Sequence, residues 1–300
     1  MPSRFTPFRL AVFVGLITAA TSLLRAQEVF RSGVDLVYVT VTVADDNGRF
    51  ISGLRREDFT VLDDGKPQEI VSFDARRVPV SLGILLDVSG SMSPDKLAAA
   101  RAAINRFSYD LLDKDDELFL ATFAARSTVR QQWTKDRDTI GRALDRARSA
   151  AGTSIYDAVR AALPIAATGI HDKKALLIVS DGDDQNSRTP LKFLQEIIRS
   201  SEVLVYALGV EASDEHINAK NLRKITDDTG GRTEIVKGFR NLQSATAKLA
   251  EELNQQYLIA YAMPHARDGA AHSIKVQVRK RGVTVRSRSG YLSGASPAGS

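Results

Sequence analysis

The sequence predicts an α/β fold with a doubly wound, mostly parallel central sheet, flanked by a small N-terminal β segment and a C-terminal β extension. Two observations carry this prediction. Between residues 78 and 256, short apolar runs alternate with stretches of helical periodicity, which is typical of βαβ units. Before and after that region, the pattern changes to period-two alternation and tight turns, which is typical of β structure.

The composition favours a folded protein and excludes several classes of site. Of the 300 residues, 43% are hydrophobic and 26% are charged, which is enough apolar sequence to bury a core. There is no cysteine, so a disulfide scaffold, a cysteine-ligated metal and a thiol nucleophile are excluded. Three of the 41 basic residues and none of the 36 acidic ones lie in the first 26 positions, which leaves 38 against 36. This near balance gives no electrostatic reason to expect a nucleic-acid partner.

Residues 1–26 are predicted to be a signal peptide. Arg4 and Arg9 precede an uncharged, mostly apolar run from residue 10 to residue 24, and a small residue, Ala26, follows. A helix of about 15 residues spans about 22 Å, which is short of the roughly 30 Å hydrocarbon core. We expect an exported protein, periplasmic or secreted, with no transmembrane segment after cleavage. An uncleaved N-terminal anchor is the alternative.

Residues 27–77 are predicted to form a small β domain. Valines alternate with polar or aromatic residues from Val37 to Val43, which indicates a half-buried strand. Tight turns are expected at 46–48 and at 63–65, where Asp or Asn precedes glycine. Turn chemistry explains both acidic clusters, and calcium binding is the alternative.

Residues 78–256 are predicted to form the α/β domain. The expected central strands are Val80–Leu86, Glu117–Phe123, Ala175–Ser180 and Val203–Leu208. Helices are expected between them, over residues 97–111, 155–167 and 191–200, with a last helix over 242–253. Ser93-Pro94 and Thr189-Pro190 each resemble an N-cap followed by proline at the first helical position.

Residues 257–293 are predicted to return to β structure, and residues 294–300 to form a small, polar tail. The expected strands are Tyr257–Tyr261, Ser273–Val278 and Val283–Arg288. Bases alternate with valines from Lys275 to Arg288, which suggests a hairpin with one basic, solvated face. Polyanion binding is an alternative interpretation of that face.

Oxygen-bearing side chains are predicted to gather at one edge of the sheet. Asp87, Ser89 and Ser91 directly follow the first strand of the α/β domain, and Asp181 follows the Ala175–Ser180 strand. Thr153 precedes the helix over residues 155–167. Ligands of doubly wound sheets bind at the carboxyl ends of the strands. Hydroxyl and carboxylate oxygens, without imidazole or thiol, suit a hard divalent cation such as Mg²⁺ or Ca²⁺.

These residues resemble the metal-ion-dependent adhesion site of von Willebrand factor type A domains. The resemblance covers roughly residues 78–256 and implies a Rossmann-like fold. It implies that Ser89, Ser91 and Thr153 reach the metal directly or through water, while Asp87 and Asp181 act mostly through water. The implied ion is Mg²⁺, with Ca²⁺ or Mn²⁺ as alternatives, and it keeps one position for an Asp or Glu of a partner protein.

The whole mature chain is also similar to a secreted bacterial family related to these domains. The similarity lies in Gly53-Leu54, Glu57–Phe59 and Asp64–Gln68 before the α/β domain and in Arg288–Tyr291 after it.

The predicted function is a secreted, divalent-cation-dependent protein-binding module, and not an enzyme. One alternative is a structural scaffold in which the metal only stabilises loops. The other is a metal-dependent hydrolase with Asp183 as general base. Gly-x-Ser-x-Gly is absent around Ser89, which argues against a hydrolase nucleophile.

Several polar residues near these motifs have structural interpretations. Asp157 is interpreted as a helix cap because Ser154 and Asp157 fit a capping box. Asp183 and Asp184 are interpreted as a solvated acidic loop. The four histidines, without the spacing of a zinc pair, are interpreted as surface residues in loops or at the ends of elements.

Overall fold

The computed structural model describes residues 35–211, 217–238, 241–265 and 269–294. The predicted signal peptide, residues 1–26, lies outside these ranges, as does the predicted tail after residue 294. Within the described ranges, no helix combines the length and the apolar character that crossing a bilayer requires.

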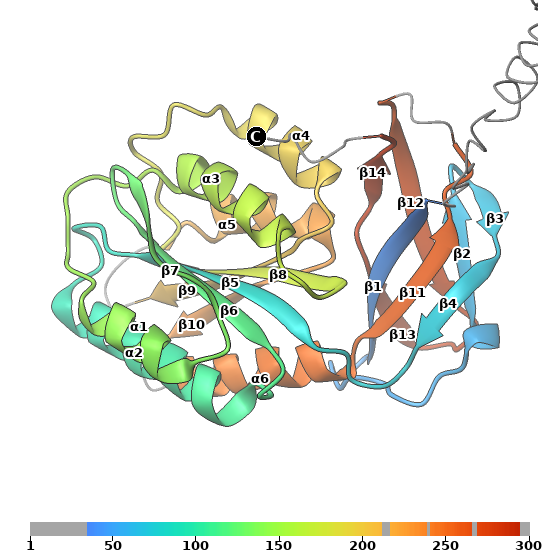
Figure 1. Cartoon of the computed structure of the whole chain (residues 1–300), viewed down its shortest axis with the longest axis horizontal. Coiled ribbons are helices and arrows are strands. Elements are labelled where there is room, and N and C mark those ends of the chain that lie inside the picture. Colours follow the sequence, from blue (N-terminus) through green and yellow to red (C-terminus); the bar gives the residue numbers. More distant parts are fainter. Residues whose placement is uncertain (1–34, 212–216, 239–240, 266–268, 295–300) are drawn as a thin grey trace, which may run out of the picture. The chain divides into compact units, whose positions relative to one another are not determined.

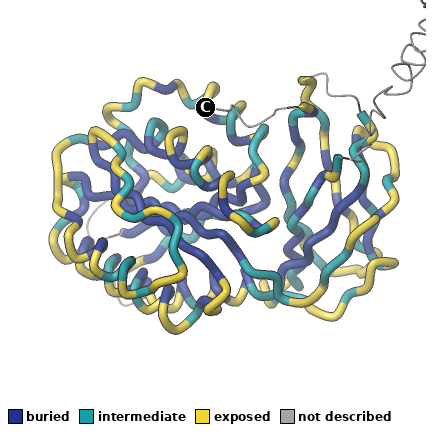
Figure 2. Tube along the Cα trace, viewed as in Figure 1, coloured by how far each residue is buried: buried dark blue, intermediate teal, exposed yellow. Residues whose placement is uncertain are grey.

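A six-stranded sheet forms the centre of the α/β domain (Figure 1). Its strand order is β10-β9-β8-β5-β6-β7, and all neighbours are parallel except the β6–β7 pair. The strands are β5 (Val80–Asp87), β6 (Glu117–Phe123), β7 (Ser127–Thr134), β8 (Lys173–Ser180), β9 (Leu204–Glu211) and β10 (Thr233–Lys237). β5, β6 and most of β8 are fully buried (Figure 2), which explains why their sequences are continuous apolar runs.

Helices cover both faces of this sheet and give it two separate cores. One core lies under α1, α2 and α6, and the other under α3, α4 and α5. The helices are α1 (Pro94–Arg106), α2 (Arg137–Asp145), α3 (Ile155–Ala167), α4 (Leu191–Ser200), α5 (Ala219–Thr226) and α6 (Leu242–Gln255). A π turn, η2 (Phe107–Leu111), extends α1, and a 3-10 turn, η3 (Asp227–Thr229), follows α5. The predicted fold class is confirmed.

Four elements of the domain were not indicated by the sequence pattern: β7, β10, α2 and α5. β7 is an edge strand whose residues are half-buried or exposed, so it lacks a continuous apolar run. The eight-residue helix α5 is largely polar and buries only one side. Weakly apolar elements of this kind are stabilised by packing against the sheet and not by their own periodicity.

The helix starts were predicted with mixed success. α1 begins as expected, because the Ser93 hydroxyl accepts from Lys96 N at 3.4 Å and Pro94 occupies the first turn. The cap predicted for α4 is wrong. Pro190 is the N-cap residue of α4, and the Thr189 hydroxyl donates instead to Asp157 Oδ1.

The β segments before and after the α/β domain join in one β-sandwich. One sheet has the order β13-β1-β11-β4 and the other β14-β12-β2-β3. The N-terminal strands are β1 (Leu36–Asp45), β2 (Phe59–Asp63), β3 (Lys66–Gln68) and β4 (Ile70–Asp74), with a 3-10 turn, η1 (Arg56–Asp58), before β2. The C-terminal strands are β11 (Tyr257–Ala262), β12 (Ala271–Val278), β13 (Val283–Arg286) and β14 (Gly290–Leu292).

The two segments were predicted as separate units, and strand pairing shows why the structure differs. β1 pairs with β11 and β13, while β2 pairs with β12. The valines of β1 are at most 1% exposed, and they pack against strands from both segments. Neither segment can bury its apolar face alone, so the two share one core.

The hairpin predicted over Lys275–Arg288 is wrong. β12 pairs with β2 and β14, whereas β13 pairs with β1 in the other sheet. The residues that link β12 and β13 therefore carry the chain from one sheet to the other, and the bases do not form one hairpin face.

A buried polar cluster connects the sandwich to the α/β domain. Glu252 of α6 is fully buried and accepts from Tyr206 of β9 at 3.1 Å and from Arg286 of β13 at 2.6 Å. Its other oxygen lies 3.0 Å from Arg232 Nε. Thr42 of β1 donates to Glu252 at 3.3 Å, which explains why this residue on the polar side of β1 is buried.

Candidate functional site

The site lies where the strand order reverses. β5 is followed in the chain by β6 on one side of it, whereas β8, on its other side, is followed by β9 and β10 farther out. The loops after β5 and β8 therefore leave the sheet in opposite directions, and sheets of this kind bind ligands at such a point.

The loop after β5 holds a buried carboxylate beside two hydroxyls. Asp87 is 0% exposed, its Oδ1 accepts from Ser89 N at 2.8 Å, and its Oδ2 accepts from the Ser180 hydroxyl at 2.6 Å. The Ser89 and Ser91 hydroxyl oxygens lie 3.0 Å apart. Asp87 is thus fixed from both sides, and the serine oxygens converge next to it.

Asp181 reaches the same loop through a buried lysine. Lys96, in the first turn of α1, donates to Ser91 O at 3.0 Å, and its Nζ lies 3.9 Å from Asp181 Oδ2. The two side chains are 1% and 7% exposed. Lys96 was missed by the sequence analysis. A cation in the first turn opposes the helix dipole, so its position was a signal that a carboxylate lies nearby.

Thr153 joins the site through the backbone of neighbouring loops. Its residue is 2% exposed, its N–H donates to Asn186 Oδ1 at 3.0 Å, and its carbonyl accepts from Gln185 N and Asn186 N. The loop before it is attached to the β5 loop, because Ala150 N donates to Val88 O at 2.8 Å. The structure thus places all five predicted residues in the loops around the ends of β5 and β8.

The electrostatics of this cluster suit a divalent cation. Burial raises the pKa of Asp87 to about 6, and the nearby charge of Asp181 adds to the effect. The pKa of half-buried Asp183 is also raised, by burial and by Asp181. Carboxylates that resist ionisation in a buried oxygen cluster are stabilised by a cation placed among them. The residues present therefore fit the group that the resemblance implies.

Asp157 does not cap its own helix, so that prediction is wrong. Its carboxylate accepts from Arg188 N at 3.0 Å and Thr189 N at 2.9 Å, which fastens α3 to the loop before α4. The start of α3 is instead capped from outside, because Asp184 Oδ1 accepts from Ile155 N at 2.9 Å. Asp184 is therefore a structural residue and not only a solvated acid.

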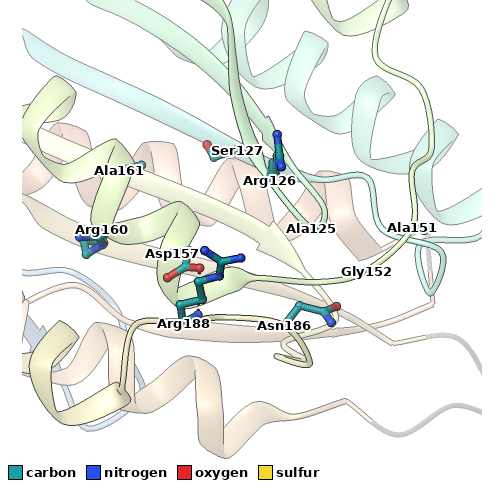
Figure 3. A pocket seen from close by; sticks show the side chains of 10 residues that line it. All are labelled: Ala125, Arg126, Ser127, Ala151, Gly152, Asp157, Arg160, Ala161, Asn186 and Arg188. Atoms are coloured by element: carbon teal, nitrogen blue, oxygen red, sulfur yellow. Dashed lines mark hydrogen bonds between the residues drawn. The ribbon is translucent and has the colours of Figure 1, made fainter.

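A hollow of about 940 Å³ adjoins Thr153. Gly152 and Asn186, the neighbours of Thr153 in the chain and in space, line it together with three arginines, Arg126, Arg160 and Arg188 (Figure 3). The arginines come from the β6–β7 connection, from α3 and from the loop before α4. The hollow therefore carries positive charge beside the oxygen cluster.

Two of the histidines are not isolated surface residues. The rings of His265 and His272 stack with centroids 3.6 Å apart, and both face the carboxylates of Asp63 and Asp64 in the β-sandwich. His265 follows β11 in a loop and is partly exposed, whereas the side chain of His272 lies in β12 and is 8% exposed, so the interpretation as a surface residue is wrong for His272. The signal that would have found them is the pairing of β2 with β12, which spacing along the chain does not reveal.

Comparisons with known proteins agree with this geometry. Residues 82–183 match the model of the von Willebrand factor type A domain. An uncharacterized protein of Synechocystis, sll0103, is 25% identical over 236 residues, which are 72% of this chain and 55% of that protein, so the chain spans about half of its length.

Two solved structures share the fold. A von Willebrand factor type A protein from Catenulispora acidiphila has a TM-score of 0.51 and 16% identity, over 88% of this chain and 74% of that one. Proximal thread matrix protein 1 of the mussel byssus has a TM-score of 0.52 and 14% identity, over 64% and 51%. Residues 82–183 therefore match the von Willebrand factor type A domain model, and the α/β domain around them has the fold of such a domain.

Proposed function

We propose that this chain is an exported, divalent-cation-dependent protein-binding module. Ser89, Ser91 and Thr153 would contact the cation directly, and Asp87 and Asp181 would act mainly through water. Mg²⁺ is the proposed ion, with Ca²⁺ or Mn²⁺ as alternatives, and an Asp or Glu of a partner protein would complete the site. The observation that supports the proposal is that the oxygens of Asp87, Ser89 and Ser91 lie together at the end of β5, with Asp181 linked to them through Lys96.

The charge of the buried groups explains why a partner carboxylate would be attracted. Asp87 and Asp181 contribute two negative charges, and the buried ammonium of Lys96 contributes one positive charge. A divalent cation among these groups leaves a net positive charge, which a further carboxylate neutralises. Mg²⁺ commonly keeps waters and accepts oxygen from a bound molecule, so the proposed coordination suits it.

The arginine-lined hollow would select for an acidic partner surface. Arg126, Arg160 and Arg188 lie next to Gly152 and Asn186, beside the loop that carries Thr153. Arginine binds carboxylates through paired N–H groups, and surface charges of this kind mainly accelerate and orient association. We infer that the partner presents one acid to the cation and further acids to these arginines.

Export is part of the proposal and is supported by the character of residues 1–26. An apolar run of signal-peptide length follows two arginines. Binding outside the cytoplasm would occur at divalent-ion concentrations that can keep such a site filled.

Titration calorimetry tests the metal site. Mg²⁺, Ca²⁺ and Mn²⁺ are titrated into the metal-stripped protein, into Ser89→Ala and into Ser244→Ala, a control that removes an exposed hydroxyl of α6. Saturable binding of one ion, weakened by about 10- to 100-fold in Ser89→Ala and unchanged in Ser244→Ala, is the expected result. Equal binding by all three proteins would place the cation elsewhere.

Peptide binding separates a binding module from a scaffold. The protein is applied to an array of acidic peptides and their Asn/Gln counterparts, with Mg²⁺ or with chelator. A binding module retains acidic peptides only with Mg²⁺. In a scaffold, chelation lowers the melting temperature while no peptide is retained in either condition. The scaffold remains the second candidate because the β5, Thr153 and Asp181 loops are bonded to one another.

A further inference from the structure

We propose that the β-sandwich holds a second metal site, built from Asp63, Asp64, His265 and His272, which binds a transition-metal ion of the zinc class. Asp63 ends β2 and Asp64 begins the following turn, whereas His265 follows β11 and His272 lies in β12. One ligand atom from each residue lies within 4.8 Å of all the others.

The distances approach those of a tetrahedral site. His265 Nε2 lies 2.9 Å from Asp63 Oδ1 and 3.6 Å from Asp64 Oδ2, and His272 Nδ1 lies 2.8 Å from Asp64 Oδ2. With zinc–ligand bonds of about 2.0–2.2 Å, neighbouring donor atoms are roughly 3.3–3.6 Å apart. The rings stack 7° from parallel, so they must tilt about χ2, which is a soft torsion, before both nitrogens point at one ion.

Buried hydroxyls orient the first carboxylate. The Asp63 side chain is 0% exposed, and its Oδ2 accepts from Tyr261 at 2.7 Å and from Tyr291 at 2.8 Å. Its other oxygen, Oδ1, is left facing His265. Hydrogen bonds that fix the non-coordinating atom of a ligand are the usual support of a metal site.

The second carboxylate is held in the same way. Asp64 has a positive φ of 47°, and its Oδ1 accepts from Ser273 N at 2.8 Å and from the Ser273 hydroxyl at 3.1 Å. Its Oδ2 faces both rings. The positive φ of Asp64 belongs to the two-residue turn between β2 and β3, where Asp-Gly is favoured, and this turn holds the carboxylate at the end of β2.

The two nitrogens of His272 contact different groups. Its Nδ1 lies 2.8 Å from Asp64 Oδ2, and its Nε2 lies 3.2 Å from the Ser293 hydroxyl oxygen. The contact with Ser293 holds the ring so that Nδ1 faces the carboxylate of Asp64, and a partner on the second ring nitrogen is the usual support of a histidine that ligates a metal.

The donor set and its charge determine the class of ion. Two carboxylates balance one divalent cation, and two neutral imidazoles add no charge. Two nitrogens and two oxygens suit zinc and its neighbours, whereas Mg²⁺ and Ca²⁺ prefer oxygen alone. The cluster is open on one side, because Asp64 and His265 are 40% and 24% exposed, so an ion can enter.

Cobalt spectroscopy of the full chain tests the proposal. Co²⁺ is titrated into the metal-stripped Asp87→Ala/Ser89→Ala protein, in which the oxygen site of the α/β domain is disabled. One equivalent is expected to produce the intense visible bands of tetrahedral Co²⁺, and Zn²⁺ is expected to displace it. Adding His265→Asn/His272→Asn should remove the bands and weaken Zn²⁺ binding by at least about 100-fold.

The control is His171→Asn, which changes a histidine whose ring contacts the Asp115 carbonyl in the α/β domain. It should leave the bands and Zn²⁺ affinity unchanged. Circular dichroism verifies that each variant is folded, and His265→Asn alone provides a milder variant if the double one unfolds. Weak octahedral spectra, or Co²⁺ binding that survives the loss of both histidines, would show that the cluster is a hydrogen-bonded ion pair network and not a metal site.

Discussion

The two candidate metal sites of this molecule are assembled in opposite ways. In the α/β domain, three donors lie within the five residues from Asp87, which ends β5, to Ser91. The other two lie just after β8 and just before α3. In the β-sandwich, His265 and His272 meet acids that lie 202 and 208 positions earlier in the chain. A site at a parallel sheet edge is visible in the sequence, whereas a site between paired strands depends on which strands pair.

The chemistry of the two sites differs as well. The first site offers only oxygen donors, which favours a hard ion. It also contains the buried ammonium of Lys96, whose positive charge favours an additional carboxylate. The second offers two imidazoles and two carboxylates, whose charges match one zinc-class ion. The two regions should therefore respond independently to different metals although they fold together.

The largest expected effect tests whether they fold together. Glu252→Ala should lower the free energy of unfolding by about 3–5 kcal/mol, because it leaves two half-buried arginines and the buried Tyr206 hydroxyl, from both regions, without their acceptor. Denaturant unfolding monitored by far-UV circular dichroism checks this, with exposed Glu251→Ala as the control. Equal stability of the two variants would mean that the regions are independent.

The second-largest expected effect is the pH dependence of stability that Asp87 causes in the α/β domain. Because its folded pKa is raised from 3.8 to about 6, its contribution to stability is full below pH 4 and is lost as the pH rises to 6. In chelator, Asp87→Asn should therefore gain stability over the original protein across this window, by on the order of 3 kcal/mol. Melting curves from pH 4 to pH 7 measure the difference. If the melting temperatures of the two proteins change with pH in the same way, burial does not raise the pKa of the Asp87 carboxylate.

Metal selectivity should separate the two sites. Asp181→Ala is expected to weaken Mg²⁺ binding by at least about 10- to 100-fold and to leave the cobalt spectrum of the sandwich unchanged. Asp110→Ala is the control, because Asp110 is an exposed acid of η2 and does not belong to the loops after β5 and β8. Calorimetry with Mg²⁺ and visible spectra with Co²⁺ measure both responses. A cobalt spectrum altered by Asp181→Ala would mean that the sites are coupled or are one.

The smallest expected effect concerns the hydroxyls behind Asp63. Tyr291→Phe should weaken Zn²⁺ binding by about tenfold, because Asp63 Oδ2 loses one of two donors that orient it. Tyr257→Phe is the control in the same core, since the Tyr257 hydroxyl donates to Ile51 O instead. Competition with a chromophoric chelator measures both affinities. If the two variants lose the same affinity, the effect is a general loosening of the core.

Local pattern was sufficient for the four inner strands of the central sheet and for the acids at the ends of β5 and β8. Buried parallel strands are continuous apolar runs, and the residue after each run lies at the edge where such sheets bind ligands. Asp87 and Asp181 could therefore be predicted without knowing any tertiary contact. Lys96 and the correct partners of Asp157 could not, because a charged residue in a helix does not reveal which loop packs against it.

The sequence by itself determined which faces are buried, where the four inner strands of the central sheet and four of its helices lie, and that Asp87 and Asp181 stand at the ends of two of those strands. Only the tertiary structure decided that β1 lies between β11 and β13, that Glu252 connects the two regions, and that His265 and His272 meet Asp63 and Asp64. The physical reason is that period-two alternation fixes the face a strand buries but not the strand beside it. That choice is made by the shared core, which neither β segment can complete alone.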